Sequence, residues 1–400
     1  MIKHLFKMVW NRKRWNALIL VEIFLSFIVL FAVAVAGFTL WNYQRNPLGF
    51  NYKGIWMLTM DTPSGAMSDD NVENTLRLAE QIDNYLKNQE PVQVHGTLNT
   101  PPYRGSNWST GLEIDQRKVH TNLSYASPGL VDALQLKISE GRWFNEGDFT
   151  EKSVTPMVVN GFLAKALFPN ESAVGKRIQD KYDDEVQEFE IIGVTDHFRK
   201  EGELNKPRKF GFLPLVFNKD IWLPRYSLLR MRPGVNPNYE EQLIKGLERI
   251  APDWSFKVQP YTQTRADYLQ SQTRNLKIMG LIAFFLLLMV AMGLIGVLWQ
   301  HVTRRTVELG VRRAKGATRN KIYAQIIGEF LVISTLAIGL GLLFVAQVPF
   351  TGLFKHATFG VLVAAYIASG LAIYVLTVIA SLYPGWMATK IMPAEALHYE

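Results

Sequence analysis

Four long apolar runs constrain the fold of this chain more than any other feature of its 400 residues. About 20 helical residues cross the hydrocarbon core of a bilayer, so apolar runs of this length predict membrane-spanning helices. The first run is too long for the apolar core of a secretory signal and lacks a small-residue cleavage site, which predicts a retained anchor. The runs cover residues 17–41, 278–299, 324–348 and 358–382. They predict a four-helix transmembrane α bundle.

The segment between the second and third runs, residues 300–323, is short and strongly basic. Against the single acid Glu308 it carries Arg304, Arg305, Arg312, Arg313, Lys315, Arg319 and Lys321. Short basic loops stay on the cytoplasmic side of a membrane. The amino-terminal tail before the first run is also basic and has no acid. Four spans then place both termini in the cytoplasm and residues 42–277 on the opposite side.

The charge of the whole chain agrees with this topology. Lysine and arginine number 43 and aspartate and glutamate 35, which gives a net charge of +8. The basic excess lies in the segments expected inside, and the domain expected outside is near neutral. The charge therefore indicates topology and gives no reason to expect a nucleic-acid partner. Cysteine is absent, and a domain of this size can fold without disulfides.

Residues 42–277 alternate strand-like and helix-like segments, which predicts an α+β domain inserted between the first two spans. A helix is expected over 68–88, with Ser68 or Asp69 as its cap. The polar, glycine- and proline-rich stretch 99–111 is expected to be a loop at the edge between two lobes. Further strands are expected at 54–60, 91–98, 155–160, 189–195, 226–231 and 254–258, and helices at 128–136, 161–168 and 239–250. Residues 264–277 look helical and run into the second span, either as a rigid connection or as a simple tether.

The sequence offers no catalytic centre, and we expect no catalytic, cofactor or metal-binding residues. Gly175-Lys176 is the only Gly-Lys pair, but Arg177 follows it and Asn170 replaces the first glycine of a phosphate-binding loop. A Gly-x-Ser-x-Gly nucleophile motif is absent. The seven histidines are scattered without the spacing of metal ligands.

Two acids interrupt the apolar runs. Glu22 lies near the inner end of the first run and Glu329 near the inner end of the third. Ionisable residues inside membrane segments are candidates for functional roles. Both are also within reach of the interface and of nearby arginines, so structural pairing and a coupling role stay open. The other two runs have no ionisable side chain, and small residues such as Gly339, Gly341 and Gly370 predict close helix packing rather than a polar pore.

Several motifs resemble the FtsX/MacB-type permease family. The cytoplasmic motif Glu308–Thr318, the following Ile326-Ile-Gly-Glu329 and the carboxyl-terminal Pro393-Ala-Glu-Ala-Leu397 are similar to family signatures. In the outer domain, Glu140–Phe144 and Ile191–Val194 resemble the MacB periplasmic core. The chain departs from the family by having Lys315 where a bulky apolar residue is common.

This resemblance implies the non-catalytic membrane subunit of an ABC transporter in a bacterial inner membrane. Such a subunit works as a homodimer, or as a heterodimer with a related permease, and converts ATP turnover into movement of an outer domain. Because the chain has no phosphate-binding loop, ATP and Mg²⁺ are expected to bind a separate ATPase subunit. The expected role is efflux of a peptide, antibiotic or similar substrate, with an adaptor and an outer-membrane duct as further partners besides the bilayer. The alternatives are control of a cell-wall hydrolase, as by FtsX, and lipoprotein extraction.

The resemblance also implies a docking site for the ATPase, and the residues fit this role. An apolar stripe framed by arginines is expected to form a short helix, Gly316 would permit a turn, and Thr318 could cap the next helix. The alternative is a basic helix resting on anionic lipid. The expected docking residues are Val307, Glu308, Leu309, Gly310, Val311, Arg312, Arg313, Ala314, Gly316, Ala317 and Thr318, with Glu329 as a possible coupling residue. The remaining parts are an interfacial helix at 1–16, a short outer loop at 349–357 and a cytoplasmic tail at 383–400.

Overall fold

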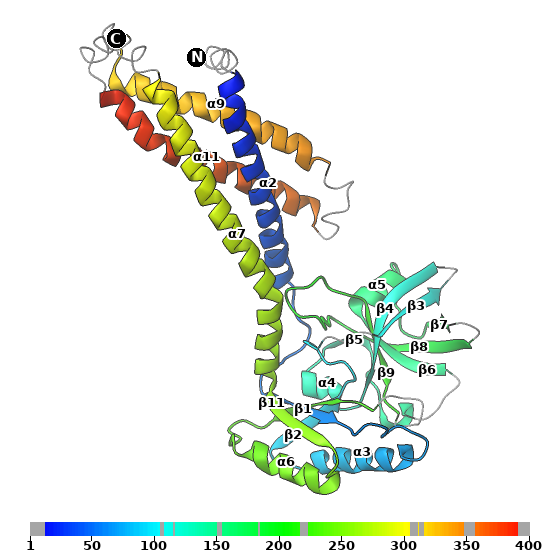
Figure 1. Cartoon of the computed structure of the whole chain (residues 1–400). Helices are drawn as coiled ribbons and strands as arrows, with labels where there is room; N and C mark the ends of the chain where they lie inside the picture. The colour runs from blue at the N-terminus through cyan, green and yellow to red at the C-terminus, as the bar shows by residue number, and fades with distance from the viewer. Residues whose placement is uncertain are drawn as a thin grey trace. The chain divides into compact units, whose positions relative to one another are not determined.

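The computed structural model describes residues 13–104, 108–114, 117–149, 154–182, 185–216, 223–304, 311, 316–347 and 357–390. The chain divides into two compact units (Figure 1). The first comprises Met1–Asn42 and Thr273–Glu400, and we call it the helical unit. The second is Tyr43–Gln272, which we call the α/β unit.

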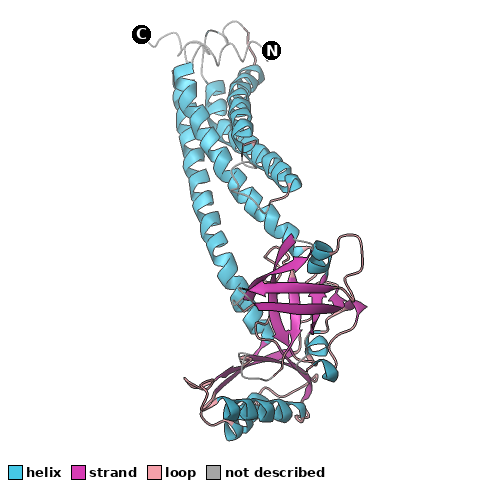
Figure 2. Ribbon diagram, turned by 90° about the vertical axis from the view of Figure 1, so that its right-hand side faces the viewer, coloured by secondary structure: helices cyan, strands magenta, loops and turns pink. Residues whose placement is uncertain are grey.

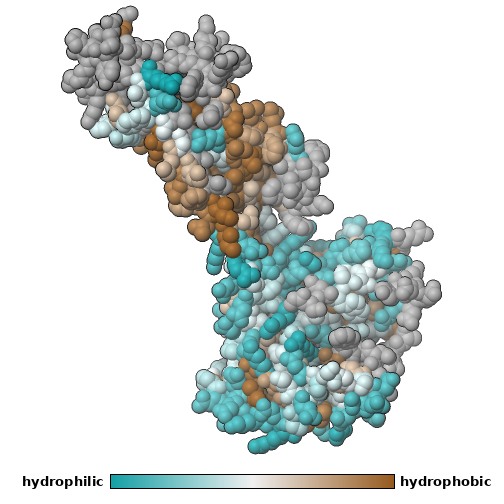
Figure 3. Space-filling model, in the orientation of Figure 1, coloured by the Kyte–Doolittle hydropathy of each residue, from teal (hydrophilic) through white to brown (hydrophobic). Residues whose placement is uncertain are grey.

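The described residues of the helical unit form four long helices. They are α2 (Lys13–Gln44), α7 (Tyr261–Thr303), α9 (Arg319–Val345) and α11 (Phe359–Lys390), of which α2 and α7 continue into the α/β unit. Each is long and apolar enough to cross a membrane, so the four expected apolar helices are present. Figure 3 shows hydrophobic residues gathered over these helices. Helices that are apolar all round are typical of a lipid environment.

The helices pack through apolar and small side chains. Phe27 of α2 and Phe330 of α9 are buried in the core of the unit. A Cβ added to Gly341 of α9 would overlap the Phe27 ring, so this glycine permits close packing, as its size predicted. Gly339 has nothing within 4 Å of such a Cβ. Between α9 and α11, the buried hydroxyls of Ser334 and Thr377 form a hydrogen bond of 2.8 Å.

One sheet of the α/β unit has four antiparallel strands in the order β11–β1–β10–β2. Its elements are β1 (Ile55–Asp61), β2 (Val92–Thr97), β10 (Tyr226–Met231) and β11 (Ser255–Pro260), with helices α3 (Val72–Lys87) and α6 (Tyr239–Ile250). Side chains of β1 alternate between two cores. Leu58 packs in the core that contains α3 and α6, whereas Met57 packs in the core shared with the rest of the unit. This sheet is therefore buried on both faces.

The second sheet has seven strands in the order β5–β8–β6–β9–β4–β3–β7, and pairing of β7 with β8 closes it on itself (Figure 2). The strands are β3 (Trp108–Ile114), β4 (Arg117–Ala126), β5 (Ile138–Gly141), β6 (Val154–Asn160), β7 (Arg177–Tyr182), β8 (Glu185–Thr195) and β9 (Phe210–Pro214). Short helices α4 (Leu130–Leu134), α5 (Gly161–Leu167) and η1 (Glu146–Asp148) connect them. The closed sheet has its own core, which includes Met157, Leu163 and Phe189.

Three local expectations need correction. Helix α3 begins at Val72 after the cap residue Asn71, so Ser68 and Asp69 do not cap it. Ser68 lies in the preceding turn, where its hydroxyl donates to the Gly65 carbonyl. The stretch expected as loop at 99–111 ends in strand β3, which starts at Trp108. Helix α4 is also shorter than expected and ends at the left-handed residue Gln135.

Candidate functional site

The expected docking segment is described only in part. Residues 305–310 and 312–315, which include most of the apolar stripe together with Arg312 and Arg313, lie outside the described residues. Val311 is helical, and Gly316 has a φ of 89°, a left-handed conformation that favours glycine. Thr318 is the N-cap residue of α9, but its side chain makes no capping hydrogen bond. The role of this segment in ATPase binding stays a prediction.

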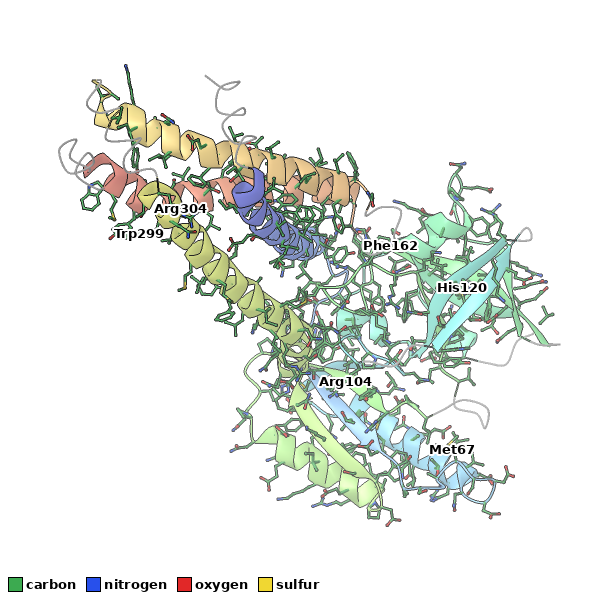
Figure 4. The ribbon with its side chains drawn as sticks, turned by 45° about the horizontal axis from the view of Figure 1, so that its top comes forward. Met67, Arg104, His120, Phe162, Trp299 and Arg304 are labelled. Atoms are coloured by element: carbon green, nitrogen blue, oxygen red, sulfur yellow. The ribbon has the colours of Figure 1, made fainter. Side chains whose placement is uncertain are left out.

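An aromatic cluster lies near the residues that flank this segment. Trp299 of α7 stacks on Tyr383 of α11 with ring centroids 5.9 Å apart, and Tyr383 also contacts Trp386. Arg304 follows closely along the chain, and Figure 4 shows Trp299 and Arg304 at this end of α7. Tryptophan, tyrosine and arginine at the end of an apolar helix are typical of a membrane–water interface.

The two intramembrane acids have different surroundings. Glu329 of α9 is buried, and its carboxylate accepts a hydrogen bond of 3.0 Å from Gln325 one turn earlier. Glu22 of α2 lies against α7, where a Cβ on Gly293 would overlap its carboxylate. Gly293 therefore gives the carboxylate of Glu22 room between two helices. Neither contact identifies a coupling role, which stays a prediction for Glu329.

The α/β unit contains a polar cleft with a volume of about 640 Å³. One wall comes from α3 and β2, and the other from the segments around Ser127 and Phe149. Asp83 is fixed in this cleft by His95 Nε2 at 2.8 Å and Lys87 Nζ at 2.7 Å. Burial acts to raise the pKa of Asp83, but its hydrogen bonds to His95 and Lys87 outweigh burial, and the pKa is lowered. The Asp83 carboxylate therefore links α3 to β2 and is not a free acid.

A further polar site with several hydrogen bonds is the segment Phe198–Asn205, which we call the junction segment. Arg199 in this segment is 2% exposed. Its Nη1 donates to the carbonyl oxygens of Tyr43 at 2.8 Å and Asn46 at 2.9 Å, and its Nη2 donates to that of Asn205 at 2.6 Å. Tyr43 lies in the last turn of α2, where carbonyl groups lack helical partners. Arg199 therefore caps the carboxyl-terminal end of α2, where a positive charge is favourable.

The same segment holds the first turns of α7. Glu203 forms an ion pair with Arg265 of α7, and the Tyr103 hydroxyl donates to Glu203 at 3.1 Å. Asn205 donates to the hydroxyl of Tyr268, also on α7, at 3.1 Å. Burial acts to lower the pKa of Arg265, but the Glu203 carboxylate outweighs it and the pKa is raised. Arg265 is therefore a fixed cation at this contact.

A buried asparagine fixes the junction segment to the closed sheet. Asn160, at the end of β6, is fully buried. Its amide nitrogen donates to the carbonyl oxygens of Phe198 at 3.2 Å and Arg208 at 2.8 Å. These two bonds hold both ends of residues 198–208, which contain the junction segment. The side-chain oxygen of Asn160 accepts from the backbone N–H groups of Leu163 and Phe210. This one side chain thus links the segment to β6, β9 and α5.

The junction segment was not among the sites expected from the sequence. The expectation that helix-forming residues run from 264 into the second span is confirmed, because α7 is one helix of 43 residues. Arg199 and Glu203 carry no local pattern, however, since Tyr43 and Arg265, their partners on the two helices, are far away in sequence. Only the glycines offered a hint. Gly49 and Gly202 have positive φ, and a Cβ on either would overlap His197 or Tyr103.

Comparison with known proteins assigns the chain to a family. Residues 17–275 match the MacB-like periplasmic core domain, and residues 280–393 match the FtsX-like permease C-terminal domain. The chain belongs to the FtsX/MacB-type permease family. The resemblance seen in its motifs is therefore confirmed, and this permease is of the ABC-transporter type, with four candidate membrane helices.

Relatives of this FtsX/MacB-type permease include proteins named for macrolide export. The "macrolide export ATP-binding/permease protein MacB" of Pasteurella multocida is 24% identical over 401 residues, which cover 94% of this chain and 57% of that protein. The protein of the same name from Wolinella succinogenes is 30% identical over 238 residues, covering 55% of this chain and 36% of that protein. The chain thus spans about half the length, or less, of these curated relatives.

Among solved structures, the periplasmic region of MacB from Actinobacillus actinomycetemcomitans is similar to this chain at 19% identity with a TM-score of 0.39. The match covers 56% of this chain and 97% of that structure.

Proposed function

We propose that this permease converts ATP binding and hydrolysis by a separate ATPase subunit into movement of its α/β unit on the outer side of the membrane. The observation that carries the proposal is the continuity of α7. This helix starts at Tyr261, which is fully buried in the core of the α/β unit, and ends at Thr303, just before the basic segment. Forty-three helical residues extend about 65 Å, roughly twice the hydrocarbon thickness of a bilayer.

The proposed topology places the basic segment 300–323 and both termini in the cytoplasm and the α/β unit outside. The positive charge of the segment supports this orientation. The aromatic cluster at Trp299, Tyr383 and Trp386 supports a membrane–water interface next to this basic segment. In this arrangement the bundle moves no substrate through a polar pore and instead transmits a displacement.

The ATPase-docking role of Val307–Thr318 is part of the proposal, and it predicts a selective defect. Gly310→Glu places a charge where the partner approaches closely, and an unpaired buried charge costs several kcal/mol at an interface. We expect Gly310→Glu to reduce co-purification of a co-expressed ABC ATPase by at least about tenfold. Each single change, Arg312→Glu or Arg313→Glu, should reduce it less, because exposed ion pairs contribute about 0–1 kcal/mol.

Gly147→Glu, a matched glycine change in the α/β unit, should leave co-purification unchanged. Undiminished ATPase binding by the Gly310→Glu protein would contradict the docking assignment. Movement can be measured separately because the chain has no cysteine. A single spin label at Asn84→Cys, on the exposed side of α3, reports the distance between two copies of a dimer. A distance that ATP and the ATPase do not change would argue against transmission.

The proposed assembly is a dimer of permeases, identical or related. Its support is the exposure of apolar side chains on α7, such as Leu281 at 69% and Met292 at 73%, which lipid or a second helix has to cover. The proposed cargo is a peptide, antibiotic or similar compound, supported by the macrolide-export names of the relatives. Regulation of a cell-wall hydrolase or lipoprotein extraction are the alternatives that a transport assay with the assembled complex distinguishes.

A further inference from the structure

The junction segment Phe198–Asn205 contacts both helices that connect the α/β unit to the rest of the chain. Helix α2 ends at Gln44 and α7 begins at Tyr261, and both ends lie within the α/β unit. In sequence these two ends are separated by the entire domain. The junction segment is short, yet its hydrogen bonds reach the end of α2 through Arg199 and the start of α7 through Glu203 and Asn205.

We infer that the junction segment is a latch that makes the end of α2 and the start of α7 move as one body, with Arg199 and Arg265 as its positioning residues. The inference deepens the proposed function, on which the use of the latch in transmission rests. The contacts themselves are properties of the α/β unit alone. A displacement of either helix therefore reaches the other helix and the closed sheet through the same eight residues.

The contact with α2 and the contact with α7 both involve charged side chains, and both come from the same short backbone segment. Arg199 donates to three carbonyl groups through its two Nη atoms at 2.6 to 2.9 Å, and charged donors form stronger hydrogen bonds than neutral ones. The side chain of Glu203 is 12% exposed, and that of Arg265 is 30% exposed. Water therefore weakens this ion pair less than it would a surface pair. Arg199 Nη2 also donates to the Asn205 carbonyl. The side chain that contacts α2 is therefore hydrogen-bonded to the residue that binds Tyr268 of α7.

Aromatic packing completes the contact with α7. The Arg265 guanidinium lies 4.7 Å from the centre of the Tyr52 ring, a cation–π arrangement. Tyr103 contacts Tyr261 and Tyr268 of α7 with ring centroids 6.0 and 5.7 Å apart. Gly202 allows the Tyr103 ring to lie against the junction segment, because a Cβ there would overlap the ring. A segment packed in this way has little freedom to move independently of α7.

Amide hydrogen exchange of the full chain in lipid nanodiscs, without ATPase or nucleotide, tests the latch. Arg199→Met removes the cap of α2. Hydrogen bonds to a charged group contribute about 1.5–3 kcal/mol, so protection of the last turn of α2 should fall by about tenfold or more. If the latch joins the helices, protection of residues 264–272 in α7 should also fall, by about threefold or more.

The reciprocal variant is Arg265→Met, which breaks the ion pair on the α7 side. It should lower protection in residues 264–272 and, through the junction segment, in the last turn of α2. Combining Glu203→Arg with Arg265→Glu restores an ion pair with opposite polarity and should recover much of the lost protection at α2. A merely structural role for either residue would not give this long-range recovery.

Arg225→Met is the matched control. Arg225 forms an ion pair with Asp61 outside the junction segment, and its loss should change neither helix end. Protection of β6 checks that each variant is folded. If the Arg199→Met protein is unfolded by this measure, protection at the last turn of α2 in the Arg265→Met protein alone tests the latch.

The latch is wrong if each variant lowers protection only in the helix that its own side chain contacts. Because the experiment contains no ATPase, this outcome would leave the proposed function untouched. Conversely, failure of ATPase docking would leave the latch measurement intact.

Discussion

The helical unit and the α/β unit distribute apolar and polar side chains in opposite ways. In the described part of the α/β unit, the large hydrophobic residues that are exposed are Met67, Trp108 and Val186. In the helical unit many are exposed, up to Phe359 at 81%. The buried polar residues also differ. The α/β unit buries the cations Arg199, Lys200 and Arg230, whereas the helical unit buries mainly hydroxyls such as Ser334 and Thr377.

The difference follows from the solvent that surrounds each unit. Water favours burial of apolar surface, so the α/β unit gains stability from its cores. Lipid is as apolar as leucine, so the helices gain little from hiding leucines and pack instead through small residues and shape. A buried cation is tolerable where carbonyl groups are available. Arg230 illustrates this, because it donates to the carbonyl oxygens of Ala133, Lys53 and Asn51.

The largest expected effect tests burial itself. Leu247→Ala removes a fully buried side chain between α6 and its sheet and should destabilise the α/β unit by about 2–5 kcal/mol. Leu281→Ala removes an exposed leucine from α7 and should change stability by about 0.5 kcal/mol or less. Thermal unfolding of the full chain in detergent, followed by tryptophan fluorescence, measures both. Equal losses would mean that the apolar surface of α7 is as important as a water-excluded core.

The next effect concerns the cations that are buried in the described part of the α/β unit. Burial lowers the pKa of Lys200 from its usual value of 10.5 to about 8, although Glu201 acts in the opposite direction. Between these values the unfolded chain binds more protons than the folded one, so this lysine makes stability rise as pH increases from about 8 to 10.5. This difference in pKa corresponds to at most about 3 kcal/mol in the free energy of unfolding.

We therefore expect Lys200→Met to stabilise the protein most at pH 7 and progressively less as the pH rises to 10. Melting temperatures of both proteins across this range provide the measurement. Because the two proteins share all other titrating groups, their difference isolates Lys200. A difference that does not vary with pH would show that the lysine is not desolvated in the folded state.

The smallest effect tests close packing in the helical unit. Gly341→Ala should cost about 1–3 kcal/mol because its methyl group would overlap the Phe27 ring. Gly339→Ala, two residues away on the same helix, meets nothing within 4 Å and should be neutral or slightly stabilising. Thermal stability in detergent distinguishes them. Similar behaviour of the two variants would mean that α2 does not pack closely on α9.

The sequence predicted the long elements well and the closed sheet poorly. Helix α6 and strand β10 begin and end where their periodicity indicated, at Tyr239–Ile250 and Tyr226–Met231. Strand β4 was missed because its buried residues include Asn122 and Ser124, which look like loop residues. Ser124 is satisfied in the interior by hydrogen bonds with Thr100. Polar residues of this kind become strand residues only when a neighbouring segment supplies their partners.

The sequence by itself determined the four apolar helices, the α+β class, the helical continuation from residue 264 into the second apolar run and the family, because each follows from local composition, periodicity or a contiguous motif. Only the tertiary structure decided that the segment around Arg199 contacts both α2 and α7. That arginine lies more than 150 residues from Tyr43, and Glu203 lies 62 residues from Arg265. Contacts between such distant residues depend on how the sheets fold together, and no local pattern of residues encodes them.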